Sequence, residues 1–259
     1  MLEVQNVCAG YDGEEIVHNV SFHLNRNENL CILGANGCGK PTFLRALGNL
    51  IPFTGSVKLD GVELRSMKRR VIAEKIALLS QISGVYFGYS VYDTVMLGRY
   101  QHIRRGFSDR PGRADREMVE QCLETVGLTD YRDRRINELS GGQLQRVFLA
   151  KVLAQDPQII LLDEPTNHLD VKHQVELIQH LKKWSESDEH TVIGVFHDIN
   201  MAMQLSDKVM FMKDGCKTAY GSMEEVTSRE LLADIYGIDI ASHLDKQCES
   251  WKKLSEKMR

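Results

Sequence analysis

The sequence predicts an α/β fold built around a parallel sheet, and three observations lead to this prediction. Apolar runs without alternation occur at 158–162, 191–196 and 208–212, as in strands that are buried on both faces. Residues 143–154 and 171–184 separate these runs and carry apolar residues at helical spacing. Strands that alternate with helices form parallel sheets, because each crossover helix returns the chain to the same end of the sheet.

Length and composition are those of an ordinary globular protein. The 259 residues are 42% hydrophobic and 26% charged, so the chain can bury a core without disulfides or a structural metal. The formal net charge of −4 argues against a surface that grips nucleic acid or an anionic membrane. No apolar run approaches the roughly 18 residues of a membrane span, and residues 1–4 do not begin a signal peptide. These features indicate a soluble, cytosolic protein.

The cysteines and histidines fit the same interpretation. The six cysteines are scattered and form no CxxC pair, which is typical of reduced thiols in a cytosolic protein. The nine histidines form neither an HExxH motif nor a closely spaced pair beside cysteines. No zinc site is therefore expected.

The first sixty residues predict short strands on either side of a glycine-rich loop. Residues 2–7 alternate with period two, and strand-like runs follow at 29–33 and 55–59. The last of these ends at Asp60-Gly61, which is a hairpin signal. Residues 42–50 carry apolar side chains at helical spacing, so the expected order is strand, glycine-rich loop, helix.

The middle and the end of the chain are more polar. Residues 99–135 are rich in arginine and aspartate, with helical patterning at 118–126. The arginines alone would suit nucleic-acid binding, but the interleaved acidic residues favour a solvated helical surface. From about residue 241 the chain is polar and charged, which predicts a frayed helix or a mobile tail.

The glycine-rich loop carries the strongest chemical signal. Its residues are Gly34, Ala35, Asn36, Gly37, Cys38, Gly39, Lys40, Pro41 and Thr42. A loop of this spacing between a strand and a helix lets backbone N–H groups surround a polyphosphate. The helix N-terminus adds partial positive charge, and Lys40 can reach the β- and γ-phosphates. The alternative, a glycine-rich turn with a surface lysine, leaves this spacing and these flanking elements unexplained.

One residue of the loop departs from the phosphate-binding pattern. The pattern has Ser or Thr directly after the lysine, where the hydroxyl ligates Mg²⁺, and this chain has Pro41. Proline fits a first helical turn but supplies neither a hydroxyl nor an N–H. Thr42 points about 100° further round the helix and cannot simply replace it. The loss could cost about 2–4 kcal/mol of Mg-nucleotide binding, so nucleotide binding is predicted and efficient hydrolysis is left open.

Two carboxylates follow the apolar run at 158–162. Asp163 and Glu164 would lie at the carboxyl edge of the sheet, where α/β folds bind their ligands. Asp163 is suited to hold Mg²⁺, directly or through water, and Glu164 is suited to polarise an attacking water as a general base. Surface carboxylates are common, so this pair indicates a catalytic site only in combination with the phosphate-binding loop.

The sequence Leu139-Ser140-Gly141-Gly142-Gln143 resembles the signature of ABC-type ATPases. Further matches to that family follow in its order over about residues 1–240. Tyr11 matches the aromatic residue that stacks on adenine, and Gln81 matches the glutamine that contacts the metal and the attacking water. Residues 167–170, which end in Asp170, resemble the loop that crosses the dimer interface. His197 matches the histidine that contacts the γ-phosphate.

The resemblance implies a phosphate-loop NTPase fold with a RecA-like parallel core. It also implies an antiparallel β subdomain at the N-terminus and an inserted helical subdomain. The expected division is 1–82 for the β subdomain and first part of the core, 83–150 for the helical subdomain, 151–240 for the rest of the core, and 241–259 for a polar tail. The implied cofactors are ATP and Mg²⁺. The implied partner is a second copy, in which Ser140, Gly141 and Gly142 serve the nucleotide held by the partner's Lys40.

A finer resemblance concerns the transported substrate. Residues 37–40 and 96–102 are similar to ATPase subunits of importers for iron-siderophore, haem or cobalamin-type metal chelates. This implies transmembrane permease subunits, an extracytoplasmic substrate-binding protein, no nucleic acid, and a peripheral location on the cytoplasmic face of the cell membrane.

Two rival interpretations stay open. One is a soluble ABC protein of DNA repair or translation, although this chain lacks the coiled-coil insertion, zinc module or second cassette that such proteins usually carry. The other is an ATP-binding subunit whose hydrolysis is impaired or absent because of Pro41. The presence of Gln81, Glu164 and His197 argues for an ATPase.

Overall fold

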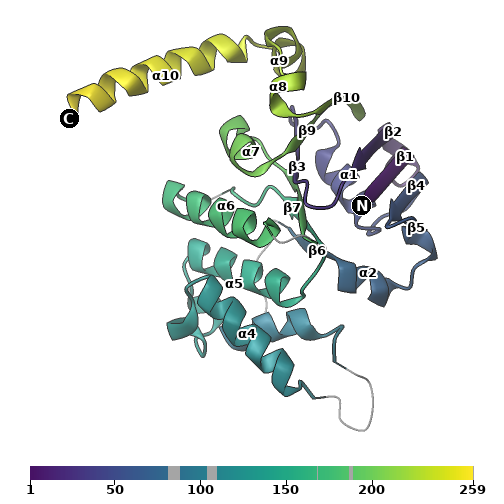
Figure 1. Cartoon of the computed structure of the whole chain (residues 1–259), viewed down its shortest axis with the longest axis vertical. Helices are drawn as coiled ribbons and strands as arrows, with labels where there is room; N and C mark the ends of the chain where they lie inside the picture. The colour runs from purple at the N-terminus through teal and green to yellow at the C-terminus, as the bar shows by residue number, and fades with distance from the viewer. Residues whose placement is uncertain (81–87, 104–109, 168, 187–188, 259) are drawn as a thin grey trace.

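The computed structural model describes residues 1–80, 88–103, 110–167, 169–186 and 189–258, which form two sheets with covering helices (Figure 1). The predicted α/β fold with a parallel sheet is confirmed. Figure 1 shows the antiparallel strands β1, β2, β4 and β5 on one side and the helices α4, α5 and α6 on the other.

The larger sheet has six strands in the order β10-β9-β3-β8-β7-β6. Their bounds are β3 (Leu30–Gly34), β6 (Ile76–Leu79), β7 (Ile159–Asp163), β8 (Thr191–Val195), β9 (Lys208–Lys213) and β10 (Cys216–Gly221). All pairings are parallel except that of β10 with β9. Every residue of β3, β7 and β8 is buried, which explains why their sequences run apolar without alternation.

The smaller sheet is antiparallel, in the order β2-β1-β4-β5. Its strands are β1 (Leu2–Tyr11), β2 (Glu14–Leu24), β4 (Phe53–Leu59) and β5 (Val62–Glu63). The predicted hairpin at Asp60-Gly61 joins β4 to β5, with Leu59 opposite Val62. Helix α1 (Lys40–Leu47) contacts strands of both sheets, so it lies between them. Its Phe43 packs edge-on against Phe22 at 6.1 Å between ring centroids.

Most of the remaining helices cover the opposite face of the large sheet or extend beyond it, whereas α2 (Arg69–Lys75) adds Ile72 to the cluster around α1. The others are α3 (Val91–Met96), α4 (Arg113–Thr125), α5 (Gly141–Ala154), α6 (Val171–Ser185), α7 (Ile199–Leu205), α8 (Met223–Val226), α9 (Arg229–Tyr236) and α10 (Ile240–Lys257). Alternate residues of β7 enter two cores: Ile160 packs with the cluster under α5 to α7, and Leu161 with the cluster around α1. None of the described helices has the length and apolar character of a membrane span.

The structure gives the segment at 96–102 a packing role. Arg99 donates to the carbonyl oxygen of Ala154 at 2.8 Å, and His102 Nε2 lies 2.8 Å from the carbonyl oxygen of Gln155. A Cβ on Gly98 would lie 2.2 Å from the carbonyl oxygen of Lys151, so only glycine fits there. The segment at 96–102 therefore packs against the C-terminal end of α5 and is hydrogen-bonded to it.

The nearly buried ion pair of Arg99 and Asp115 stabilises this contact with α5. We therefore expect Asp115→Asn to lower the free energy of unfolding by about 1–3 kcal/mol at pH 7. Arg99 Nε lies 3.0 Å from Asp115 Oδ1, and both side chains are nearly buried. Burial acts to raise the pKa of Asp115, but the Gly112 N–H and Arg99 outweigh it and lower the pKa.

A carboxyl group with a lowered pKa in the folded state adds stability above its ordinary pKa and loses it as pH falls. The difference between wild type and Asp115→Asn should therefore shrink below about pH 4. Urea unfolding at pH 7 and pH 3.5 measures both quantities. An Asn variant as stable as wild type at pH 7 would contradict the expectation.

Candidate nucleotide-binding site

Three described chain segments that carry polar or charged side chains meet at one edge of the large sheet. Strands β3, β8, β7 and β6 are neighbours and run parallel, so their carboxyl ends lie side by side. Gly34 ends β3 and Asp163 ends β7, while His197 comes two residues after β8. Gln81 follows β6 in sequence but lies outside the described residues. The edge predicted from the sequence therefore exists, as expected for ligand sites in α/β sheets.

The glycine-rich loop leaves β3 in a conformation that side chains would block. A Cβ on Gly34 would lie 2.2 Å from the carbonyl oxygen of Met212. Gly39 has a φ of 92° and caps the N-terminus of α1, a conformation that favours glycine. Asn36 and Gly37 are exposed, so this part of the loop is open to a ligand.

Lys40 lies inside the loop. Its side chain is only 2% exposed, and Nζ donates to the carbonyl oxygens of Gly34 and Ala35, each at 2.8 Å. The sulfur of Cys38 lies 3.8 Å from the same Nζ. Burial raises the pKa of the Cys38 thiol, and Lys40 opposes that shift. The loop thus holds one positive charge at the amino end of α1, where a phosphate group can replace the carbonyl contacts.

Pro41 and Thr42 follow Lys40 in the first turn of α1. Pro41 is half-buried and keeps helical geometry there, as expected for proline in a first turn. Thr42 is buried at 7% exposure. Position 41 therefore supplies neither a hydroxyl nor an N–H to the open side of the loop.

Arg45, which the sequence analysis missed, lies beside the predicted metal ligand. Its guanidinium is 3.6 Å from Asp163 Oδ2, and its Nη1 donates to the hydroxyl of Tyr11 at 3.1 Å. Burial raises the pKa of Asp163, and Arg45 partly opposes this shift. Pro41 and Arg45 are four residues apart and therefore lie on the same side of α1. No local pattern predicts the contact of Arg45 with Asp163, which depends on the packing of α1.

Tyr11 lies on the rim of the site. It is the last residue of β1 and is 38% exposed. The bond from Arg45 Nη1 holds its hydroxyl, while the ring stays accessible to a flat ligand. This arrangement is compatible with stacking on a base.

Each carboxylate oxygen of Glu164 contacts a neighbouring side chain. His197 Nε2 lies 2.5 Å from Oε1, and Asn167 Nδ2 donates to Oε2 at 2.5 Å. Glu164 has a φ of 51°, the left-handed region that non-glycine residues seldom adopt. Such strain persists where the surrounding structure fixes it, and it is frequent at functional sites. The structure therefore brings together Glu164 and His197, which the sequence placed in one site.

The signature residues begin helix α5. Ser140 is the N-cap residue: its Oγ accepts from Gln143 N at 3.3 Å, and its own N–H donates to Gln143 Oε1 at 2.9 Å. Gly141 is exposed, and a Cβ there would meet nothing within 4 Å. A Cβ on Gly142 would lie 2.9 Å from the ring of His173. The signature thus forms an open, glycine-lined helix N-terminus, a geometry suited to anions.

Asp170 begins helix α6 beside the signature. Its Oδ1 accepts from the backbone N–H of His173 at 2.9 Å and lies 2.7 Å from His173 Nδ1. The backbone N–H and the imidazole of His173 lower the pKa of Asp170. Since the ring of His173 also lies close to Gly142, one side chain links Asp170 to the signature.

The residues described here fit a magnesium ion in part. Mg²⁺ in nucleotide sites takes one or two carboxylates, phosphate oxygens and water, and Asp163 offers such a carboxylate at the correct edge. Among the described residues, no group of three or more His, Cys, Asp or Glu side chains forms a metal cluster. The ion would therefore depend on the nucleotide and water for most of its ligands.

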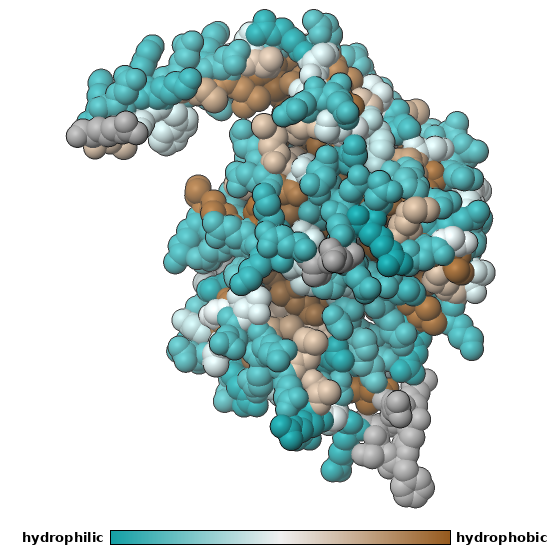
Figure 2. All heavy atoms as spheres, viewed as in Figure 1, coloured by the Kyte–Doolittle hydropathy of each residue, from teal (hydrophilic) through white to brown (hydrophobic). Residues whose placement is uncertain are grey.

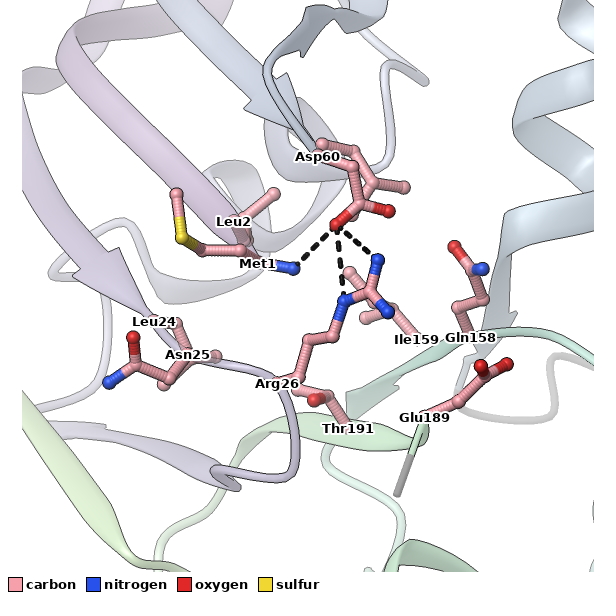
Figure 3. A pocket seen from close by; sticks show the side chains of 11 residues that line it. Met1, Leu2, Leu24, Asn25, Arg26, Asp60, Gln158, Ile159, Glu189 and Thr191 are labelled. Carbon is pink, nitrogen blue, oxygen red and sulfur yellow. Dashed lines mark hydrogen bonds and ion pairs between the residues drawn. The ribbon is translucent and has the colours of Figure 1, made fainter. Parts of the chain in front are cut away.

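A hollow lies away from this edge (Figure 3). Gln158, Ile159 and Thr191 line it at the opposite ends of β7 and β8. Asp60 fills its polar side by accepting from the Met1 amine at 2.9 Å and from Arg26 at 3.0 Å. The charges of Met1, Arg26 and Asp60 are thus paired with one another on this side of the hollow.

The comparisons with known proteins identify the family of this chain. The family model described as ABC transporter matches residues 17–167. An ABC transporter ATP-binding protein of Methanocaldococcus jannaschii is 38% identical, over 92% of this chain and 92% of the relative. A petrobactin import ATP-binding protein of Bacillus anthracis is 35% identical, over 92% of this chain and 87% of the relative. A ferric enterobactin transport ATP-binding protein of Escherichia coli is 34% identical over the same shares.

Solved structures give the same result for the fold. A metal-chelate type ABC transporter in an inward-facing conformation aligns with a TM-score of 0.77 and 29% identity, covering 90% of this chain and 88% of that one. A dimeric ATP-binding cassette with ADP and Pi aligns with a TM-score of 0.76 and 30% identity, covering 86% and 99%. The predicted phosphate-loop NTPase fold is confirmed, and the chain belongs to the ATP-binding proteins of the ABC transporter family.

Proposed function

We propose that this chain is the ATP-hydrolysing subunit of an importer for an iron-siderophore, haem or cobalamin-type metal chelate. The observation that carries the ATPase function is the convergence of Lys40, Asp163 and the paired Glu164 and His197 at one sheet edge. The names of the relatives support the substrate class, because the B. anthracis and E. coli proteins are named for petrobactin and ferric enterobactin.

Nucleotide binding follows from the loop. The backbone N–H groups at the start of α1 and the Lys40 ammonium would hold the β- and γ-phosphates. Tyr11 would stack on the adenine from the rim. Asp163 would hold the magnesium ion, which would supply positive charge to stabilise the phosphates. Pro41 removes one ligand from this set.

Glu164 is placed to act as the general base. His197 and Asn167 each hold one of its oxygens, so the carboxylate has one orientation before a water arrives. His197 would reach the γ-phosphate from the end of β8. By the family resemblance, Gln81 would contact the metal and the attacking water.

The proposed active unit is a dimer of this chain on two permease subunits, at the cytoplasmic face of the membrane. Ser140, Gly141, Gly142 and Gln143 begin a helix whose exposed glycine leaves room for the phosphates of a nucleotide on the other copy. Asp170 would lie at the same interface. An extracytoplasmic binding protein would deliver the chelate to the permease subunits.

The second candidate function is an ATP-binding subunit with impaired or absent hydrolysis. The specific observation that favours it is Pro41, which leaves the open side of the loop without a hydroxyl. The intact contact between Glu164 and His197 favours hydrolysis.

Uptake of labelled metal chelates by cells that lack this chain tests the importer function. We expect uptake of one class among ferric siderophores, haem and cobalamin to fall at least 10-fold. Wild-type chain should restore it, and Glu164→Gln should not. Undiminished uptake of all three classes would overturn the importer assignment.

A further inference from the structure

Helix α10 forms an extension whose apolar side is largely uncovered. It projects from the body of the molecule beyond α9 (Figure 1). Ion pairs of Arg229 with Asp239 at 3.8 Å and with Asp245 at 3.7 Å hold its first turns. No residue of α10 is fully buried, and Trp251 is 68% exposed. An aromatic of this size gains free energy when a partner covers it.

The apolar residues of α10 follow a heptad pattern. We define the α10 stripe as Ile240, Leu244, Gln247, Trp251, Leu254 and Met258, which recur at alternating steps of four and three residues. This spacing is that of the seam between two paired helices. Figure 2 shows the hydrophobic residues along one edge of α10, while its other edge is hydrophilic.

The α10 stripe is complementary to itself when reversed. In an antiparallel pair centred on position 249, Leu244 faces Leu254 and Gln247 faces Trp251. Met258 lies opposite Ile240, which is half-buried and also packs against the core of its own copy. The neighbouring Cys248 would lie beside Cys248 of the other copy. No acidic residue and no pair of like charges comes together along the seam.

The charges of α10 favour the same antiparallel order. Residues 239–249 carry three carboxylates and one lysine, whereas residues 250–258 carry three lysines and one carboxylate. Asp239 and Asp245 also pair with Arg229 of their own chain, so they are partly neutralised. Reversed pairing still sets the lysine-rich half of one helix against the half that carries the carboxylates, whereas parallel pairing would set the lysines of two copies together.

We propose that α10 joins two copies of this chain as an antiparallel helix pair. The body of each copy attaches at the N-terminal end of its α10, so the two bodies lie at opposite ends of the pair and do not collide. The pair uses no residue of the nucleotide site. It therefore forms without nucleotide and goes beyond the nucleotide-dependent dimer proposed above.

The contact between two copies of α10 is small. The 18 residues of α10 span about 27 Å. Two helices of this length bury less than the roughly 1,200–2,000 Å² of a standard stable interface. We therefore expect a dissociation constant of about 1–100 μM, and a monomer at nanomolar concentrations.

Sedimentation velocity of the full chain in EDTA without nucleotide tests the pairing. We expect dimers to appear with rising concentration, and Trp251→Ala combined with Leu254→Ala to weaken the dimer at least 10-fold. The matched control is Lys252→Ala with Glu256→Ala, which changes two outward-facing residues of the same turns and should leave the dimer intact. A monomer at 200 μM, or equal effects of both double variants, would overturn the proposal.

Crosslinking with a short bismaleimide tests the orientation. With exposed Cys216 changed to Ser, Cys248 should link two copies. Ser255→Cys with Cys248→Ser should not link, because two copies of position 255 lie about 20 Å apart in the antiparallel pair. Linkage through position 255 would overturn the antiparallel order. Binding of Trp251 to anionic vesicles by a chain that stays monomeric would identify a membrane-surface helix instead.

Discussion

Glu164→Gln is expected to reduce ATP turnover at least 100-fold while ATP binding stays within a few-fold of wild type. The amide keeps the size of the side chain and a contact to His197 or Asn167, but it cannot take a proton from water. With ATP bound and not consumed, the dimer should persist on size-exclusion chromatography. Phosphate release at saturating Mg-ATP measures the rate, and a fluorescent ATP analogue measures binding.

The control for this variant is Glu176→Gln, which changes a carboxylate on α6 whose partner is the exposed Lys172. It should leave turnover unchanged. The trapped dimer must also require ATP, because a dimer formed through α10 would persist without nucleotide. Normal hydrolysis by Glu164→Gln would show that Glu164 is not the base. A loss of ATP binding in that variant would show that its main contribution is structural.

The strands of the parallel sheet were predictable because burial on both faces leaves a local pattern. The runs at 158–162 and 191–196 became β7 and β8 within a residue or two. Strand β6 was missed, since its four residues directly follow α2 and acquire their strand geometry by pairing with β7 about 80 residues later. Local sequence carries little information on such a distant pairing.

The polar C-terminal segment was expected to be a frayed helix or a mobile tail, and the structure shows a regular helix from Ile240 to Lys257. The charged residues that suggested a tail occupy one side of that helix. The apolar residues are spread at intervals of three and four, which a composition argument overlooks. The N-cap bond from Ser242 N to Asp239 Oδ1 at 3.1 Å starts the helix.

Some residues of the candidate site could be predicted from the sequence, and one could not. Lys40, Asp163, Glu164 and His197 were predictable because each follows a strand whose end the chemistry requires. Arg45 was missed because its contact with Asp163 spans 118 positions of sequence and depends on how α1 packs between the two sheets. A motif records which residues a ligand needs, whereas an ion pair formed by packing leaves no local pattern.

Pro41→Ser is expected to raise the affinity for Mg-ATP at least 30-fold and to increase turnover at low Mg²⁺. Serine restores both the hydroxyl for the metal and the N–H for the phosphate, which together correspond to about 2–4 kcal/mol. Arg45 makes the effect larger, because its positive charge already lies 3.6 Å from Asp163 and opposes a second cation there. Titration of ATP binding against Mg²⁺ measures the change without relying on turnover.

Pro41→Ala separates the two contributions, because alanine restores the N–H alone. If the metal ligand dominates, Pro41→Ala should resemble wild type in its Mg²⁺ dependence, and only Pro41→Ser should shift it. If the phosphate contact dominates, both variants should bind ATP more tightly even in EDTA. Identical Mg²⁺ dependence and rates for all three chains would show that Asp163 and the nucleotide suffice to hold the ion. Proline at this position would then have no cost for the ATPase, and the non-hydrolysing alternative would lose its only structural support.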